Sequence, residues 1–333
     1  MTDTAASKPW WADPLPLGRY RFVAQVLEPL ELPPFTGSLL RGQFGAHLRA
    51  LACTTGASKC GGCAQVGQCA YSVVFDGALA PDGPHADKGY SQVPNPYVIA
   101  PPVGGRTVPP GENLEFGMVL VGHATTQLPL VAAAWHMALA QGLGPRRARA
   151  RLTHIQWLDD SNQTHTLWTP ASGHHMAPHT PQLQVPPPAW QGGACTLQLL
   201  TPLRLQQQSG VVGSHSLTAP MLLSALGRRV ALLLEMHGGM HGIVAQAKQL
   251  HEHGHDLHMQ TTLHWHDWVR YSARQRQEMT LGGLLGTITL HTTHAATAHA
   301  LWPWLWLGQC LHAGKNATMG LGQYRVHTDL SLL

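Results

Sequence analysis

The pattern of hydrophobic and polar residues predicts the same order of strands and helices twice along the chain. In the first half, the roughly alternating pattern of residues 19–27 and 115–122 predicts two strands. Apolar residues recur every three or four positions over 38–51, which predicts an amphipathic helix, and residues 128–141 are expected to form a second helix. The basic segment 146–158 is expected to be a further strand.

The second half repeats this order after a stretch rich in proline and histidine. A strand, a helix, two strands, a helix and a last strand are predicted over 195–205, 217–236, 261–268, 284–292, 295–311 and 321–327. The order strand, helix, strands, helix, strand is the pattern of the ferredoxin-like, or RRM-like, fold. We therefore expect an α+β protein with two ferredoxin-like domains in tandem.

Changes in composition suggest where the domains begin and end. Residues 1–17 are expected to be a polar N-terminal tail and residues 18–165 the first domain. Residues 166–193 are expected to be a linker, because proline, histidine and polar residues dominate them, and residues 194–333 the second domain. A chain of 333 residues is long enough for two such domains.

Composition narrows the class of protein. Only 11% of the residues are charged, histidine occurs 23 times, and the net charge of +4 is compatible with nucleic-acid binding. The chain starts without the basic and apolar segments of a signal peptide, and the apolar run near 301–311 is too short to cross a bilayer. We expect a cytoplasmic protein with no membrane partner.

Four of the six cysteines, Cys53, Cys60, Cys63 and Cys69, lie close together. Without an export signal, such a cluster indicates a metal site rather than disulfides. Two residues separate Cys60 from Cys63, a spacing typical of zinc hairpins, and the flanking cysteines would complete a closed structural site. The sequence predicts a structural zinc ion in a cysteine-rich insertion of the first domain. The alternative is four reduced thiols in a loop.

Gly314, Lys315, Gly320 and Gly322 lie between the last predicted helix and the last strand. Glycines let the backbone approach a phosphate closely, successive N–H groups can bind an anion, and Lys315 adds a positive charge. We expect this glycine-rich loop to contact phosphate groups. The alternative is a tight turn that closes a pair of strands.

Arginines gather in three further places. They are Arg270, Arg274 and Arg276 before a glycine-marked strand, Arg146, Arg147, Arg149 and Arg151 on the predicted basic strand, and Arg228 and Arg229 on a predicted helix. Arginine binds phosphate and stacks on bases, so each group is a candidate nucleic-acid contact. The alternative for each group is a solvated loop, strand or helix surface.

The segment from His251 to His255 matches the H-E-x-x-H pattern of zinc proteases. That pattern requires the interior of a helix, where both histidines share a face, and Gly254 weakens a helix here. The surrounding residues are also rich in histidine, so chance matches are frequent. We expect a polar surface loop that contacts RNA or binds metal adventitiously, and we do not expect a metalloprotease.

Four stretches taken together resemble one family. They are the segment from Phe35 to His47 with the cysteine cluster and Tyr71, the segment Thr201-Pro-Leu-Arg204, the segment Arg270-Tyr-Ser-Ala-Arg274-Gln, and the terminal Gly320-Leu-Gly322. In this arrangement the chain resembles the CRISPR-associated endoribonucleases that cut precursor CRISPR RNA within its repeats, a branch of the RAMP proteins. The resemblance runs from about Arg19 to about Tyr324.

The resemblance implies two ferredoxin-like domains that bind repeat RNA on a basic surface, partly through the glycine-rich loop. It implies cleavage without a catalytic metal, in which the ribose 2′-OH attacks the adjacent phosphate and leaves 2′,3′-cyclic phosphate and 5′-OH ends. The implied partners are repeat RNA, the processed guide RNA and other subunits of a CRISPR effector complex.

The match places His47 where the family often has its catalytic histidine, with Arg41, Arg49 and Lys315 as candidates to bind RNA and stabilise negative charge. Histidine suits proton transfer because its pKa lies near neutrality. The alternative for His47 is a partly buried helix residue with a satisfied hydrogen bond. Phe35 departs from the family, because some members have a tyrosine here. That departure supports an alternative function, a non-catalytic RNA-binding subunit of an effector complex.

Overall fold

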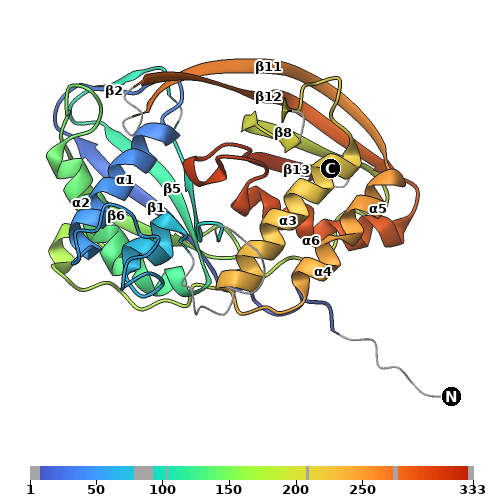
Figure 1. Ribbon diagram of the computed structural model, residues 1–333, viewed down its shortest axis with the longest axis horizontal. Helices are drawn as coiled ribbons and strands as arrows, with labels where there is room; N and C mark the ends of the chain where they lie inside the picture. Colours follow the sequence, from blue (N-terminus) through green and yellow to red (C-terminus); the bar gives the residue numbers. More distant parts are fainter. Residues whose placement is uncertain (1–7, 79–92, 103, 208–209, 273–276, 329–333) are drawn as a thin grey trace.

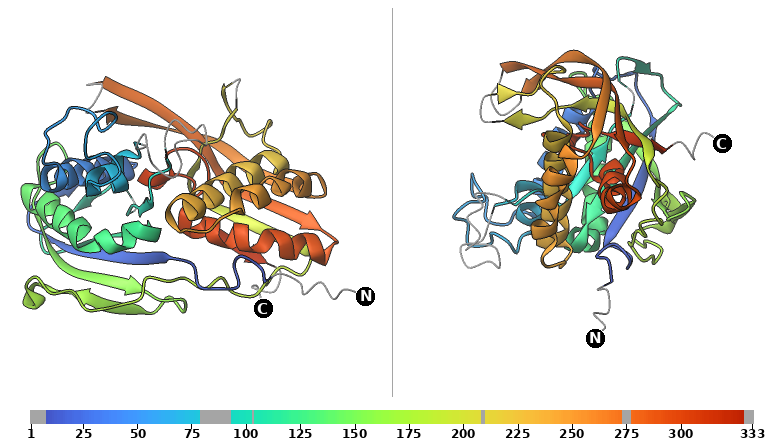
Figure 2. Two further views of the ribbon diagram at one scale, coloured as in Figure 1. Left: turned by 60° about the horizontal axis from the view of Figure 1, so that its bottom comes forward. Right: turned by 90° about the vertical axis from the view of Figure 1, so that its right-hand side faces the viewer.

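The computed structural model describes residues 8–78, 93–102, 104–207, 210–272 and 277–328, with the backbone alone over 269–272 and 277–280. Two α/β units lie side by side, and a long hairpin of the second unit arches over the first (Figure 1). Each unit has one antiparallel sheet with two main helices against one face (Figure 2).

The first domain is a ferredoxin-like fold with one extra strand. Its sheet has the order β3-β5-β1-β6-β7. The strands are β1 (Leu17–Val26), β3 (Tyr97–Ala100), β5 (Asn113–Val121), β6 (Ala150–Leu158) and β7 (Thr164–Trp168). Helix α1 (Gly37–Ala52) follows β1, and α2 (Leu128–Gln141) follows β5 after a 3-10 turn over Gly122–Gln127. Two short strands, β2 (Leu30–Glu31) and β4 (Thr107–Val108), pair outside this sheet.

Aromatic side chains fill the core between the helices and the sheet of the first domain. The ring of Trp135 on α2 lies 4.5 Å from Phe116 on β5 and 5.2 Å from Phe44 on α1, between ring centroids. Phe22 on β1 stacks on Phe116 at 5.3 Å. Because such rings bury large apolar surfaces, these four residues fix α1 and α2 against the sheet.

The second domain repeats the same topology. Its sheet has the order β11-β12-β8-β13. The strands are β8 (Gly193–Leu203), β11 (His258–Ser272), β12 (Gln277–Thr292) and β13 (Tyr324–Thr328), with a small ladder of β9 (Gln206–Gln207) and β10 (Gly210–Val211) beside them. The helices are α3 (Ala219–His237), α4 (Ile243–Ala247), α5 (Gln249–His255) and α6 (Ala295–Leu311). The side chain of Thr218 caps α3 by accepting a hydrogen bond from the backbone N–H of Met221.

The expected α+β fold of tandem ferredoxin-like domains is confirmed, and the helices predicted over 128–141 and 295–311 have the observed bounds. Two expected strands start later than predicted, and the last of them, β13, begins at Tyr324 rather than at 321. β6 begins at Ala150 rather than at 146, because Arg147 adopts a φ of 49° in a tight turn that hydrogen bonds between Leu143 and Ala148 close. The short strand β3 was not predicted.

The expected surface loop around the histidine run is wrong. Residues 249–255 form α5, and β11 begins at His258. Gly254 lies where α5 crosses the start of α3 very closely. A Cβ atom at this position would lie 2.6 Å from the Cα of Pro220, so a glycine is required. The glycine therefore permits a close helix crossing here and does not end the helix.

The predicted tail and linker both contribute to the folded structure. Leu15 and Leu183 exchange two backbone hydrogen bonds of 2.9 Å, and both side chains are buried. The ring of Trp10 lies 4.7 Å from that of Trp304 on α6. β7 occupies the start of the predicted linker. These segments therefore hold the two domains together.

Two further contacts join the domains at the hairpin and at the glycine-rich loop. The ring of Phe35, just before α1, lies 5.4 Å from that of Trp268 on β11, in a small cluster with Leu321. At Gly37 the first turn of α1 meets the carbonyl group of Met319 so closely that any side chain would collide with it. No helix of the described chain is long and apolar enough to span a membrane.

Candidate active site and nucleic-acid interface

His47 lies on the third turn of α1 and faces the end of α2. Its side chain is 8% exposed. Nδ1 donates a 2.8 Å hydrogen bond to the backbone carbonyl of Gln43, which leaves Nε2 as the nitrogen that can exchange a proton. Nε2 lies 3.2 Å from Oε1 of Gln141, and the Gln141 residue is exposed at the last position of α2. Nε2 therefore lies next to an exposed side chain at the end of α2.

The turn after α2 brings arginines beside Gln141. Nε of Arg147 donates a 3.4 Å hydrogen bond to the backbone carbonyl of Gln141. Arg146 forms an ion pair with Glu31 at 3.1 Å, and Arg149 one with Glu28 at 2.6 Å. Exposed pairs of this kind contribute little free energy, so RNA phosphates can compete for these arginines. The structure thus places His47 and this basic group at the same end of the first domain.

Arg151 is the one member of the predicted basic group that lies within β6. It is exposed and donates a 2.7 Å hydrogen bond to the side chain of Gln25 on β1. Arg146, Arg147 and Arg149 precede the strand, and the expected row of alternating arginines on one strand face is therefore wrong. They are instead exposed around the turn between α2 and β6.

The glycine-rich loop packs against the first domain. Gly320 is buried at a φ of 98°, next to Ile99 and Pro101, and Gly322 is also buried. The N–H group of Gly320 donates to Ala317, and that of Gly322 donates to Pro202, both at 2.9 Å. These two glycines form a tight turn, the alternative considered above, and their N–H groups are not free for an anion.

Lys315 and Gly314 are the more accessible part of this loop. The Lys315 residue is exposed, and its backbone N–H donates a 2.8 Å hydrogen bond to the carbonyl of Arg204. The loop meets α1 at Gly37, whereas His47 lies ten residues further along, which corresponds to about 15 Å of helix. Lys315 therefore suits binding of RNA away from His47 rather than charge stabilisation beside it.

Arg41 and Arg49 project from α1 onto a pair of stacked aromatic rings. The guanidinium of Arg41 lies 4.5 Å from the ring centroid of Phe75, and that of Arg49 lies 5.6 Å from the ring centroid of Tyr71. Tyr71 and Phe75 stack at 5.4 Å. Arg49 also donates a hydrogen bond to the carbonyl of Ala57. Both arginines thus attach the segment after α1 to that helix, in addition to any contact with RNA.

The four clustered cysteines line one small cavity between α1 and the π-helical segment Ser72–Asp76. The hydroxyl of Thr55 lies 3.9 Å from Sγ of Cys53 and 3.4 Å from Sγ of Cys63. Sγ of Cys69 donates to the carbonyl of Ala52. Burial raises the pKa of Cys60 to about 11.

The cysteine side chains converge without forming a ligand set. In the described part of the chain, no group of three or more His, Cys, Asp or Glu side chains is arranged to hold a metal ion. Four thiols suit zinc chemically, and the four cysteine residues line the same small space. Zinc binding would require these thiols to turn inward and displace the hydroxyl of Thr55.

The two arginines on α3 differ in orientation. The Arg228 residue is exposed, so it remains a candidate RNA contact. Arg229 points inward, and its Nε donates a 2.7 Å hydrogen bond to the carbonyl of Leu311 at the end of α6. Desolvation lowers the pKa of Arg229 to about 10. Arg229 therefore holds α6 against α3, and this inward orientation argues against a contact with RNA.

Of the three arginines predicted before the glycine-marked strand, Arg270 is the one within the described residues. The backbone of Arg270 pairs with Met279 near the end of β11, and its side chain is not described. Arg274 and Arg276 lie outside the described residues.

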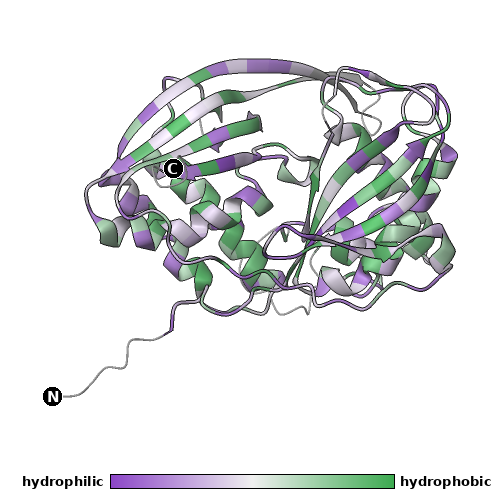
Figure 3. Ribbon diagram, turned by 180° about the vertical axis from the view of Figure 1, so that it is seen from behind, coloured by the Kyte–Doolittle hydropathy of each residue, from purple (hydrophilic) through white to green (hydrophobic). Residues whose placement is uncertain are grey.

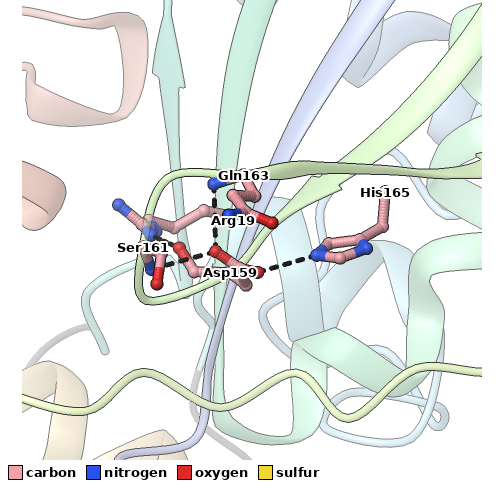
Figure 4. A network of polar contacts seen from close by, with 5 residues as sticks. All are labelled: Arg19, Asp159, Ser161, Gln163 and His165. Atoms are coloured by element: carbon pink, nitrogen blue, oxygen red, sulfur yellow. Dashed lines mark hydrogen bonds and ion pairs between the residues drawn. The ribbon is translucent and has the colours of Figure 1, made fainter.

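A polar network on the β6–β7 turn was not predicted (Figure 4). One carboxylate oxygen of Asp159 accepts 2.9 Å hydrogen bonds from the N–H groups of Ser161 and Gln163, and the other lies 2.7 Å from Nε2 of His165. The hydrogen bond from His165 is the main reason that the pKa of Asp159 is lowered. Arg19 on β1 donates to the backbone of Asp159. The contacts satisfy the carboxylate within the turn and tie the turn to β1.

The zinc-protease pattern does lie on a helix. His251 and His255 share a face of α5, with their ring centroids 5.0 Å apart, and Nδ1 of His251 lies 3.1 Å from Oγ of Ser224. Among the described residues, no third metal-ligating side chain joins these two histidines.

Comparisons with known proteins agree with the fold. A family model described as the CRISPR-associated endoribonuclease Cas6 matches residues 197–324, and a model of an N-terminal domain, AF_1859_N, matches residues 15–181. No protein of curated function matches the chain in sequence.

Solved Cas6 structures share the architecture of the whole chain. The product complex of the Cas6 protein TTHB231 is 13% identical with a TM-score of 0.54, and the match covers 93% of this chain and 100% of that one. A second structure of TTHB231, from Thermus thermophilus, is 14% identical with a TM-score of 0.51 and covers 95% and 100%. These likenesses concern the fold.

A chain of a partial Cas6-RT-Cas1–Cas2 complex is 15% identical with a TM-score of 0.50. The match covers 96% of this chain and 47% of that one, so this chain spans about half of that larger protein. Three findings agree. The chain has tandem ferredoxin-like domains, the CRISPR endoribonuclease model matches most of the second domain, and solved Cas6 proteins share the fold. The second domain belongs to the Cas6 family of CRISPR-associated endoribonucleases, and the whole chain shares the fold of solved Cas6 proteins.

Proposed function

We propose that this protein cuts precursor CRISPR RNA within its repeats without a catalytic metal. In the proposed reaction the ribose 2′-oxygen attacks the adjacent phosphorus, the bond from phosphorus to the 5′-oxygen breaks, and the products carry a 2′,3′-cyclic phosphate and a 5′-OH. The observation that carries the proposal is the position of His47, whose exchangeable Nε2 lies directly beneath the exposed Gln141 at a basic end of the first domain.

The reaction needs one proton removed from the 2′-OH and one delivered to the leaving 5′-oxygen. His47 takes part through Nε2 in one of these transfers, because its Nδ1 is committed to the carbonyl of Gln43. The RNA must displace the side chain of Gln141 to reach Nε2. Arg147, whose Nε already contacts the backbone of Gln141, then lies close enough to stabilise the extra negative charge that develops on the phosphate.

RNA binding is proposed to extend from this basic end to Lys315 and the hairpin of the second domain. The exposed cations Arg146, Arg147, Arg149 and Lys315 would bind phosphates without reading sequence. A product complex is among the solved relatives, and a protein that keeps its cleaved repeat could pass it to effector subunits. We include such subunits as proposed partners.

A second function remains, that of a non-catalytic subunit that only holds guide RNA. Two observations favour it. Phe35 replaces the tyrosine found in some relatives and packs on Trp268, and His47 is 8% exposed. A phenylalanine ring cannot transfer a proton, so no second acid or base is supplied from that position.

The test is to incubate the purified protein with the CRISPR repeat RNA of its source genome in the presence of EDTA. Shortening of the RNA at one position supports the endoribonuclease. Tight binding with an intact RNA would support the guide-holding subunit and would contradict the proposed reaction.

A further inference from the structure

Trp265 is an exposed aromatic residue on the outer strand of the long hairpin. It is 41% exposed, and the other large exposed hydrophobic residues of the described chain are aliphatic. Its strand, β11, has a hydrophilic stretch where it arches over the molecule (Figure 3). Its neighbours His264, His266 and Asp267 are all exposed. Tryptophan is highly buried on average, so an indole this exposed among polar residues stands out.

The indole of Trp265 is held in a fixed orientation without being buried. Its Nε1 donates a 2.7 Å hydrogen bond to Oδ1 of Asp267 on the same strand. The ring lies over Gly282 on β12, where any Cβ atom would collide with it. Glycine thus makes room for the ring on one side, and the hydrogen bond fixes its polar edge. The residue is 41% exposed, so we take the side of the ring away from Gly282 as the accessible one.

A cation lies at the same glycine. Arg204 donates a 2.7 Å hydrogen bond from its guanidinium to the carbonyl oxygen of Gly282. The backbone carbonyl of Arg204 accepts a hydrogen bond from Lys315 in the glycine-rich loop. Gly282 therefore brings an open indole face and a guanidinium group together, and Arg204 connects both to an exposed lysine. An aromatic face with adjacent cations is how proteins bind unpaired nucleotides.

We propose that Trp265 stacks on an unpaired base of the bound repeat RNA and that Arg204 binds a neighbouring phosphate. The inference rests on the proposed function, since it assumes that repeat RNA is the ligand. A purely structural alternative is that the indole only shields Gly282 from solvent, as aromatic residues do across strands. Trp268 on the same strand shows what such a structural role looks like here, because it is 5% exposed and packs on Phe35.

The two roles predict different behaviour for three substitutions. A stacking role needs a π-system, so Trp265→Tyr keeps most of the affinity for repeat RNA, whereas Trp265→Leu and Trp265→Ala lose it. A shielding role needs only apolar bulk, so Trp265→Leu would resemble Trp265→Tyr. Val211→Ala, which removes another exposed apolar side chain, is the matched control.

The experiment measures the Kd for repeat RNA, with thermal unfolding to confirm that each variant is folded. We expect Trp265→Ala and Trp265→Leu to weaken binding by about 5- to 150-fold, the range found for base-stacking aromatics, and Trp265→Tyr by no more than about threefold. Arg204→Ala should lower the slope of log K against log salt by about 1, whereas the Trp265 variants should leave it unchanged.

Repeat RNA carrying 2-aminopurine at each unpaired position in turn locates the base. Quenching at one position by the wild type, lost in Trp265→Leu, supports the proposal. Wild-type affinity in a folded Trp265→Ala variant, with the wild type still cutting RNA, overturns this inference and leaves the proposed function standing. A wild type that neither binds nor cuts repeat RNA overturns both.

Discussion

Oε1 of Gln141 lies 3.2 Å from Nε2 of His47 and covers the one ring nitrogen that can exchange a proton. The two residues end up together because α1 and α2 pack side by side on the sheet of the first domain. Gln141 has no charge and is exposed, so RNA can move it at little cost.

Removing the imidazole should stop the reaction and leave binding intact. We expect His47→Ala to reduce the cleavage rate by about 10²- to 10⁴-fold, the usual contribution of a positioned acid or base. The Kd for repeat RNA should change little, because the side chain is 8% exposed. Gln141→Ala is the matched control and should cut at least as fast as the wild type. Unchanged single-turnover cleavage by His47→Ala would remove this histidine from the mechanism.

The contact between α1 and the glycine-rich loop should be sensitive to a single methyl group. In Gly37→Ala the new Cβ would collide with the carbonyl of Met319, so the two domains must shift apart locally. We expect a loss of about 1–3 kcal/mol in the free energy of unfolding.

Gly42→Ala, on the same helix, meets no atom within 4 Å and is exposed. It should be neutral or stabilise the protein by up to about 1 kcal/mol, since alanine is the better helix former. Urea unfolding of both variants checks the pair. Equal stability of the two would show that the domains do not depend on this contact.

We propose that the cysteine cluster binds one structural zinc ion. Protein purified without a histidine tag should contain about one zinc per chain, and Cys60→Ser should lose it while Cys310→Ala keeps it. Because burial raises the pKa of Cys60 to about 11, zinc must displace its proton, and the apparent affinity should fall as the pH falls. A trace of zinc far below one per chain in the wild type would leave four reduced thiols as the better description.

The buried His312 should make the fold sensitive to acid. Desolvation is the main cause that lowers its pKa to about 3, the nearby guanidinium of Arg229 adds to the shift, and Nδ1 has no hydrogen-bond partner among the described residues. A histidine whose pKa is lowered in the folded state makes its full contribution to stability at pH values above its unfolded pKa, which is near 6.5. This contribution is lost as the pH falls from 6.5 towards 3.

At pH 5, His312 lowers the free energy of unfolding by about 2 kcal/mol relative to its value at neutral pH. We expect the difference in melting temperature between pH 7.5 and pH 5 to shrink in His312→Asn. The exposed His264, replaced in the same way, is the control and should leave the difference unchanged. An equal acid sensitivity in wild type and His312→Asn would refute this assignment.

Local sequence signals were sufficient to predict much of the fold. The bounds of α2 agree because an apolar segment starts with Leu128 and Pro129 and is followed by Gly142. β3 was missed because it has four residues and lies between prolines, which hide a short strand. The start of β6 and the helix α5 were missed because each depends on a specific local geometry, the positive φ of Arg147 and the close approach of Gly254 to Pro220.

The candidate site was less accessible to sequence reasoning. The resemblance to a family indicated His47, and the basic stretch after α2 was visible as a run of arginines. Gln141 carries no signal, since only the packing of α1 on α2 places it over His47. The role of Gly320 was ambiguous for the same reason, because its packing against Ile99 and Pro101 joins distant parts of the chain.

The most direct test of the proposed reaction is cleavage of repeat RNA in EDTA, compared with the same RNA carrying a single 2′-deoxy nucleotide at the mapped cut site. The account predicts that the wild type cuts the first RNA and leaves the second intact while binding both equally. Cleavage of the deoxy RNA at the same position would contradict attack by the 2′-OH, and an intact first RNA in EDTA that is cut once a divalent metal is restored would contradict metal independence.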